Sequence, residues 1–123
     1  MIASKSADPP SDRDRVLLDE SVPHDLLLHL APLDVVTVQQ LGWAGMKNGA
    51  MLRTAREAGI RVLVTVDRRI EYQQNIPKSG LALVVLKARS ARMPDILPLV
   101  PALLAALPLV QIGQVTHIEQ PER

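Results

Sequence analysis

Two adjacent carboxylates follow the first apolar stretch of this chain, and a third follows a later one. Asp19 and Glu20 come directly after "RVLL" at residues 15–18, and Asp67 ends "RVLVTVD" at residues 61–67. Carboxylate oxygens are the ligands that Mg²⁺ and Mn²⁺ prefer. A divalent cation held by two or three carboxylates can activate water and neutralise the negative charge of a phosphodiester in its transition state. Acids that follow a strand also serve as ordinary helix caps, so spacing alone leaves both interpretations open.

The carboxylates can meet only if the stretches before them are neighbouring strands of one sheet. Short aliphatic runs alternate with helical patterns and loops, which favours an α/β fold with three layers. We expect a mostly parallel central sheet of four to five strands with helices on both faces. The strands are expected at residues 15–18, 34–38, 61–67, 81–86 and, at an edge, 114–119.

A strand order of 2-1-3-4 would place the first and third strands side by side. Binding sites of open parallel sheets lie beyond the carboxyl ends of the strands, where the strand order reverses. In that order Asp19 and Asp67 would face each other. Repulsion between unpaired carboxylates would then favour a cation or a proton between them.

Three segments are expected to be helical. Residues 22–31 contain clustered leucines, residues 50–59 carry one apolar face and end at a glycine, and residues 96–107 are apolar on nearly every side. Pro98 and Pro101 suit the first turn of the last helix. A helix this apolar must be covered, which predicts a homodimer face or a partner groove, with two-fold pairing as the default.

The composition restricts the class of protein. The chain has 123 residues, a formal net charge of +1 and no cysteine. The length suits one domain. The absence of cysteine excludes disulfides and thiolate metal sites. The small net charge means that any contact with nucleic acid would have to be local. No apolar run reaches the length of a membrane span, and the start of the chain lacks a signal-peptide pattern. We expect a cytoplasmic domain at residues 15–119 between tails at 1–14 and 120–123.

Further polar side chains are expected near the same edge of the sheet. Lys87, Arg89 and Ser90 follow the fourth strand, and the planar guanidinium of Arg89 suits a phosphate. A solvated basic loop is the alternative interpretation. Trp43 lies in a glycine-rich loop with Asn48 after it, and it either stacks on a base or closes the core.

The order of these segments resembles the small bacterial PIN-like domains, relatives of the PIN nucleases. The resemblance covers residues 15–119 and rests on "VLLDESVP", "DVVTVQQLGWAGMKNGAMLRTAREAG", "RVLVTVDRRIEYQQN" and "LALVVLKARS". It implies a flavodoxin-like sheet with an acidic pocket for Mg²⁺ or Mn²⁺. Asp19 matches the acid of the first strand, with Glu20 beside it, and Asp67 matches the acid after "VT".

The resemblance also implies a function. PIN nucleases cut RNA, and many are toxins that pair with an antitoxin protein. It therefore implies a metal-dependent endoribonuclease, the toxin of a type II toxin–antitoxin module. Asp19, Glu20 and Asp67 would be both metal ligands and catalytic residues. The candidate substrate-binding residues are Trp43, Asn48, Gln73, Gln74, Lys87, Arg89 and Ser90.

Two positions depart from the family pattern. PIN nucleases usually have a further acid at the start of the helix after the middle loop, where this chain has Lys47 and Asn48. They often have another acid two residues past the "VTVD" acid, where this chain has Arg69. Fewer carboxylates weaken the binding of a divalent cation. The alternative function is a catalytically weakened PIN-like module that binds RNA or protein.

Overall fold

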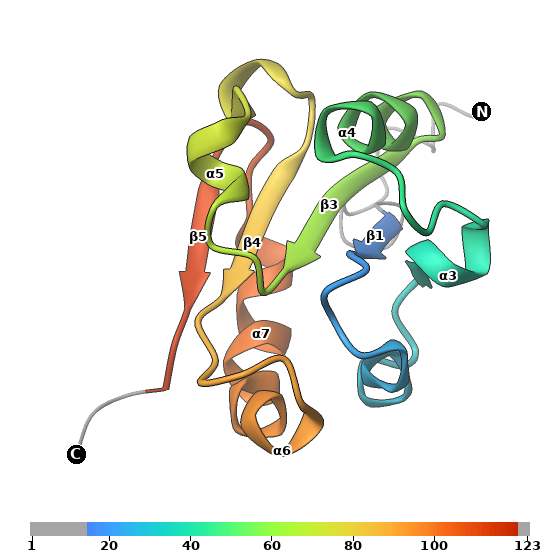
Figure 1. The fold of residues 1–123 in the computed structure, drawn as a ribbon. Helices are drawn as coiled ribbons and strands as arrows, with labels where there is room; N and C mark the ends of the chain where they lie inside the picture. Colours follow the sequence, from blue (N-terminus) through green and yellow to red (C-terminus); the bar gives the residue numbers. More distant parts are fainter. Residues whose placement is uncertain (1–14, 121–123) are drawn as a thin grey trace, which may run out of the picture.

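A computed structural model describes residues 15–120 and contains one sheet of five parallel strands. Their order is β2-β1-β3-β4-β5, with helices on both faces (Figure 1). This confirms the predicted α/β class, the layers and the 2-1-3-4 order, with the last strand at an edge. The strands are β1 (Arg15–Leu18), β2 (Val35–Thr37), β3 (Ile60–Thr65), β4 (Ala82–Leu86) and β5 (Val115–Ile118).

Helical segments supply apolar side chains to both faces of the sheet. One face packs against α3 (Val38–Leu41), α4 (Asn48–Glu57), α5 (Ile70–Gln73) and the 3-10 turn η2 (Ile76–Lys78). The other packs against η1 (His24–His29), α6 (Met93–Ile96), η3 (Leu97–Leu99), α7 (Val100–Ala106) and η4 (Leu107–Leu109). Alternate strand residues point to opposite faces, so the sheet divides an aliphatic core into two halves.

The longest helix within residues 15–120, α4, confirms the predicted amphipathic segment. It buries Met51, Leu52 and Ala55, which recur at helical spacing, and exposes Arg53 and Arg56. Just beyond its end, Gly59 has a φ of 84°. This left-handed conformation ends the helix and turns the chain into β3.

Two predicted helices differ in the structure. The segment at residues 22–31 contains the 3-10 helix η1 in place of an α-helix. The segment at residues 96–107 is not one helix, because prolines recur along it and each lies in the first turn of a separate short piece. Proline cannot donate the N–H that a continuous α-helix needs.

Two predicted strands end earlier than expected. β2 ends at Thr37, whose hydroxyl accepts the backbone N–H of Gln40 and begins α3. β3 ends at Thr65, so Asp67 lies in the turn after the strand. None of the helices between residues 15 and 120 has the length and hydropathy that crossing a bilayer requires. The predicted tail at 1–14 and most of the tail at 120–123 lie outside the described residues.

Candidate functional site

The carboxyl ends of β1 and β3 lie side by side, and Thr65 joins them. The strands pair in parallel, with Leu18 opposite Val64. The buried hydroxyl of Thr65 donates to Asp19 Oδ2 over 2.7 Å and accepts the backbone N–H of Asp67 over 2.9 Å. The fold therefore brings Asp19 and the turn that carries Asp67 to one place.

Asp19 is buried, and both of its carboxylate oxygens accept hydrogen bonds from the protein. Its Oδ1 accepts the backbone N–H of Glu20 over 2.6 Å, and its Oδ2 accepts the hydroxyl of Ser21 over 2.8 Å as well as that of Thr65. A carboxylate has about four acceptor positions. Asp19 thus acts as the local cap of the turn after β1, and little of its acceptor capacity is left.

Asp67 is paired with Arg69. Its Oδ1 accepts the backbone N–H of Arg69 over 2.9 Å and Nε over 3.1 Å, and its Oδ2 accepts Nη2 over 3.2 Å. The hydrogen bonds from the Arg69 side chain hold the pKa of Asp67 below its usual value, against a smaller opposing effect of burial. The same contact raises the pKa of Arg69. Arg69 therefore favours the charged form of this carboxylate and occupies both of its oxygens.

Glu20 extends toward a different part of the chain. Its Oε1 accepts the backbone N–H of Gly45 over 2.9 Å, so it ties the loop before α4 to the end of β1. Within residues 15–120, no three His, Asp or Glu side chains form a group that could hold a metal ion. In this arrangement the three candidate acids do not fit a preformed site for Mg²⁺ or Mn²⁺, because Asp67 and Glu20 are already engaged elsewhere.

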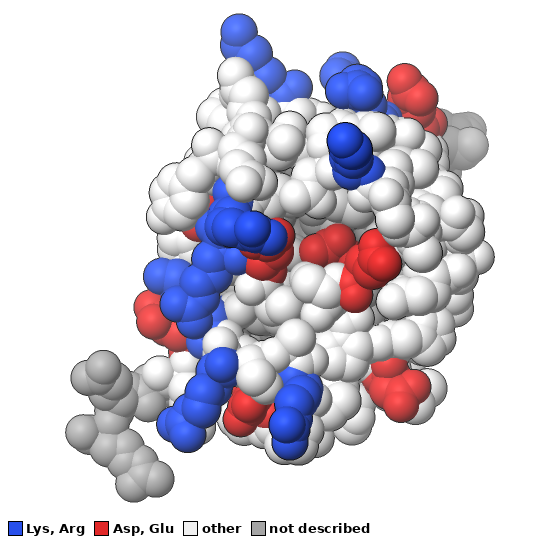
Figure 2. Space-filling model, viewed as in Figure 1, with Lys and Arg blue, Asp and Glu red and all other residues white. Residues whose placement is uncertain are grey.

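The charges on this face are separated. Figure 2 shows acidic side chains over the carboxyl ends of β1 and β3, and a band of basic side chains beside them on the side of β4 and β5. We call the region of Asp19, Glu20 and Asp67 the acidic edge. Arg68 connects it to the basic side, because its Nη2 donates to the carbonyl oxygen of Ala88 over 3.3 Å.

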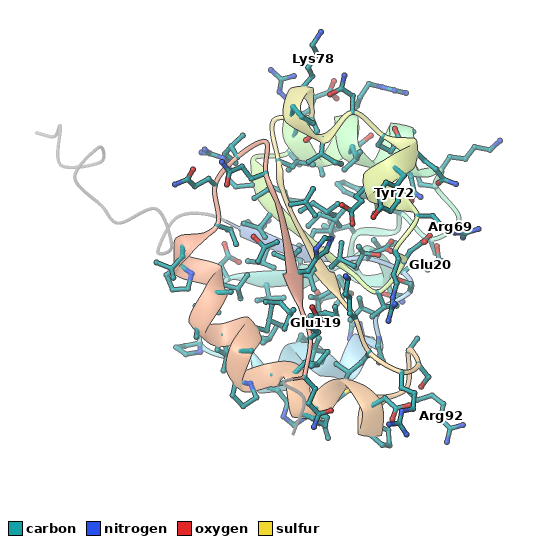
Figure 3. The ribbon with its side chains drawn as sticks, turned by 90° about the vertical axis from the view of Figure 1, so that its left-hand side faces the viewer. Glu20, Arg69, Tyr72, Lys78, Arg92 and Glu119 are labelled. Carbon is teal, nitrogen blue, oxygen red and sulfur yellow. The ribbon has the colours of Figure 1, made fainter. Side chains whose placement is uncertain are left out.

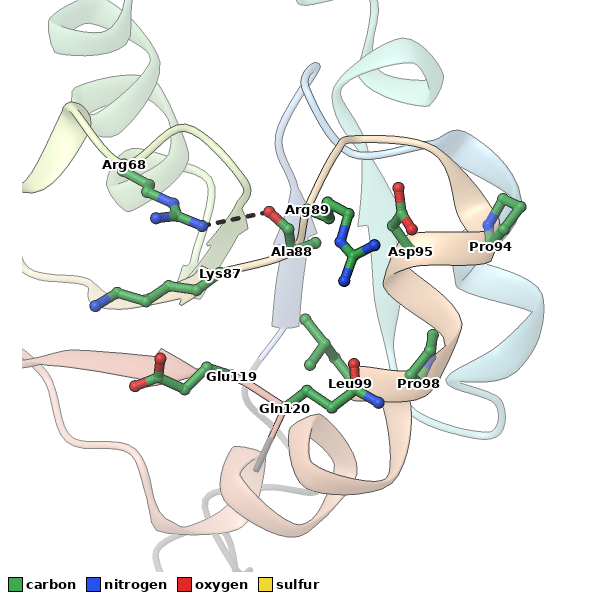
Figure 4. Close-up of a pocket in the computed structure, with 10 residues that line it drawn as sticks. All are labelled: Arg68, Lys87, Ala88, Arg89, Pro94, Asp95, Pro98, Leu99, Glu119 and Gln120. Atoms are coloured by element: carbon green, nitrogen blue, oxygen red, sulfur yellow. Dashed lines mark hydrogen bonds between the residues drawn. The ribbon is translucent and has the colours of Figure 1, made fainter. Parts of the chain in front are cut away.

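A pocket of about 450 Å³ lies on the basic side, beyond the ends of β4 and β5 (Figure 4). We call it the edge pocket. A ligand pocket typically has a volume of this order. Its lining residues are Arg68, Lys87, Ala88, Arg89, Pro94, Asp95, Pro98, Leu99, Glu119 and Gln120.

The edge pocket combines cations with an apolar wall. The guanidinium of Arg89 points into it, and Pro98 and Leu99 lie opposite (Figure 4). Asp95 is engaged with the hydroxyl of Ser90 over 2.6 Å, which gives Ser90 a role in the loop. Arg89 and the half-buried Lys87 have no side-chain hydrogen bond or ion pair with another described residue. The edge pocket therefore combines three cations and an apolar wall with the carboxylates of Asp95 and Glu119.

The remaining candidate residues lie elsewhere. Trp43 is half-buried and packs against the core half that includes α4, which supports its core interpretation. Asn48 is the first residue of α4, and Gln73 is exposed on α5. Gln74 lines a separate pocket beside Gly49. None of these four is hydrogen-bonded through its side chain to a described residue of the acidic edge.

Two contributions to the site were not expected from sequence. Thr65 lies in the expected strand at residues 61–67 without a predicted role, and Arg69 stands where a further acid is missing. A local signal exists for both, since Thr65 and Arg69 each lie two residues from Asp67. Side chains of Asp and Thr commonly bond a backbone N–H two residues further on, as both do here.

Comparisons with protein-family models, with curated proteins and with solved structures give no match for this chain. The resemblance to PIN-like domains therefore remains a prediction from the sequence. The function has to be argued from the chemistry of the site, because one fold serves many functions.

Proposed function

We propose that this protein is a PIN-like module that binds single-stranded RNA at the carboxyl end of its sheet without depending on a divalent cation. The edge pocket carries the proposal, because it places Arg68, Lys87 and Arg89 next to the acidic edge. Cleavage is not part of this proposal, since the side chain of Arg69 is hydrogen-bonded to both carboxylate oxygens of Asp67.

The groups in the edge pocket suit one nucleotide of an RNA chain. A guanidinium binds phosphate oxygens in a fork geometry, and an ammonium adds a point charge. The apolar surface of Pro98 and Leu99 can receive a base or ribose face. The protein has a formal net charge of only +1, so binding must depend on a few such local contacts and not on a broad basic field.

The test is the binding of a fluorescent single-stranded RNA, measured by anisotropy at several salt concentrations. We expect Arg89→Gln to weaken binding about tenfold, the value of one charge-assisted hydrogen bond. The slope of log K against log salt should become shallower by about 0.7, as for one lost phosphate contact.

The matched control for this test is Arg92→Gln. It removes the same charge from an exposed arginine that is not among the residues lining the edge pocket. Equal weakening by the two variants, or no binding by the wild-type protein, would contradict the proposal.

The second candidate function is a metal-dependent endoribonuclease, the toxin of a toxin–antitoxin pair. The observation that favours it is the meeting of Asp19 and the Asp67 turn at Thr65, where the order of strands reverses. In the described arrangement Arg69 competes for Asp67. Mn²⁺ binding would therefore require the Asp67–Arg69 contact to open.

Mn²⁺ titration by calorimetry, with RNA cleavage followed in parallel, distinguishes the two candidates. The enzyme interpretation expects wild-type binding that disappears in Asp67→Asn, together with cleavage. The binding-module interpretation expects neither in the wild-type protein at millimolar Mn²⁺. If the protein is the binding module, Arg69→Gln is the variant expected to gain Mn²⁺ affinity, because it frees the carboxylate of Asp67. Arg92→Gln is the control.

A further inference from the structure

A second pocket, of about 240 Å³, lies between α4 and the α5–η2 segment, away from the edge pocket. We call it the α4 pocket. Figure 2 shows basic side chains over α4 and η2, on the upper part of the face that carries the acidic edge. The lining residues are Gly49, Leu52, Arg53, Arg56, Gln74, Asn75, Lys78 and Ser79.

The described residues that line the α4 pocket include cations and no carboxylate. Arg53, Arg56 and Lys78 bring three cations, and no Asp or Glu is among the described residues that line it. Glu57 lines only the adjoining depression beside the two arginines. None of the three cationic side chains has a hydrogen bond or ion pair to another described residue. The edge pocket, in contrast, balances its three cations with two carboxylates.

Neutral donors complete the lining of the α4 pocket. The side-chain oxygen of Asn75 accepts the backbone N–H of Lys78 over 3.3 Å, so its amide NH₂ is available to donate. The Gln74 amide lies beside Gly49 at the other side. The amide NH₂ groups of Gln74 and Asn75 are donors that suit an anion with several oxygens, although the Gln74 side-chain oxygen lies nearer to Gly49 than its nitrogen does.

The aliphatic part of the Arg56 side chain is packed against the backbone of Gly80. A Cβ at Gly80 would lie 2.7 Å from Cδ of Arg56 and 2.9 Å from its Nε, so the Arg56 side chain packs directly on the glycine backbone. Lys78 extends from η2 into solvent (Figure 3). Arg56 is thus a positioned donor, whereas Lys78 adds mobile charge at the rim.

We propose that the α4 pocket binds a phosphate group through Arg53 and Arg56, with Lys78 at its rim. This site is independent of the proposed RNA contact in the edge pocket. Its ligand is either a small free phosphate or a phosphate of a nucleic acid chain. All three cations are exposed, so screening by solvent keeps the affinity for inorganic phosphate modest, in the millimolar range.

The test is a titration with inorganic phosphate, followed by amide shifts in two-dimensional NMR at constant ionic strength. We expect saturable shifts at Gly49 and Ser79 in the wild-type protein, and affinity at least tenfold weaker in Arg53→Gln. Arg56→Gln serves as the second variant. Arg92→Gln removes the same charge outside the pocket and should bind like the wild-type protein.

A second arm repeats the titration with a short single-stranded RNA that lacks terminal phosphates. Shifts at the same two amides that added inorganic phosphate reverses would identify a chain phosphate as the ligand, and shifts with inorganic phosphate alone would identify a small free phosphate. Either result supports the pocket. Wild-type shifts that stay linear, or that Arg53→Gln and Arg92→Gln change equally, would overturn it. Arg89→Gln tests the edge pocket separately, so the two proposals can fail independently.

Discussion

Thr65 is the residue on which the acidic edge depends. Its hydroxyl is buried, donates to the buried carboxylate of Asp19, and accepts the N–H of Asp67. A lost partner leaves buried polar groups unsatisfied, which costs more than the bond itself contributes. Asp19 and Thr65 therefore support the local structure whether or not the edge binds a cation.

We expect Thr65→Val to lower the free energy of unfolding by about 2 kcal/mol, because Asp19 and the N–H of Asp67 each lose a partner. Urea denaturation measures the change. Thr65→Ser keeps the hydroxyl and should lose about 1 kcal/mol for the buried methyl group. Thr54→Val on α4 is the control and should change stability by less than about 0.5 kcal/mol. A Thr65→Val cost no larger than that of the serine variant would refute this role.

The Asp67–Arg69 pair makes a prediction about pH. Hydrogen bonds from Arg69 hold the pKa of Asp67 below its usual value, so in Arg69→Gln this pKa should rise toward that of an ordinary aspartate. The folded-state pKa is lowered, so the pair stabilises the protein above the unfolded-state pKa. That contribution is lost as pH falls through the folded-state pKa.

Carboxyl ¹³C titration of Asp67 measures the pKa shift directly. Denaturation of the wild-type protein and Arg69→Gln should show their difference in stability near neutral pH and lose it in strong acid. Arg92→Gln should leave the Asp67 titration unchanged. An Asp67 pKa that does not move in Arg69→Gln would show that the contact is absent in solution.

At the scale of elements, a turn at Gly59 ends α4 and leads the chain directly into the central strand β3. Gly59 has a φ of 84°, and a Cβ there would meet no atom within 4 Å. A substitution there is strained by backbone conformation alone. Gly49 lies inside the same helix without a positive φ, and its Cβ would lie 3.4 Å from Gln74 Oε1.

The two glycines form a matched pair for stability measurements. Gly59→Ala should lower the free energy of unfolding by about 1 kcal/mol because alanine resists a positive φ. Gly49→Ala should be neutral or stabilise by up to about 1 kcal/mol through its higher helix propensity. Similar effects of both substitutions in thermal or urea unfolding would contradict this account of the helix end.

At the scale of the whole molecule, the broken helical segment from α6 to η4 leaves apolar side chains exposed. Its leucines at 99, 103 and 107 are buried, whereas Leu104 is 37% and Leu109 is 76% exposed. The homodimer expected from the sequence remains a prediction. Exposed apolar surface of this kind favours association.

Light scattering after size exclusion tests this expectation at several protein concentrations. The wild-type protein should approach the mass of two chains, and Leu104→Glu with Leu109→Glu should return it to one. Leu28→Glu is the control, because Leu28 is 70% exposed on η1, outside this segment. A monomer at every concentration would rule the homodimer out.

Much of the fold could be read from local patterns. The continuous apolar runs at residues 15–18 and 81–86 predicted strands buried on both faces, and the alternation of elements predicted a parallel sheet. The pattern was less informative where proline interrupts an apolar run. The segment at residues 96–107 reads as one helix by hydropathy but is divided by its prolines.

The sequence by itself determined the α/β class and the placement of Asp19 and Asp67 just after two strands, because apolar periodicity is a local property. The strand order entered only as an expectation, which the tertiary structure confirmed. Only the tertiary structure decided what each acid contacts: Asp19 meets Thr65, and Asp67 is paired with Arg69. Only the tertiary structure also assembled the two basic pockets, which combine residues from separate segments. Hydrogen bonds and charge clusters depend on distances in space, and spacing along the chain does not contain them.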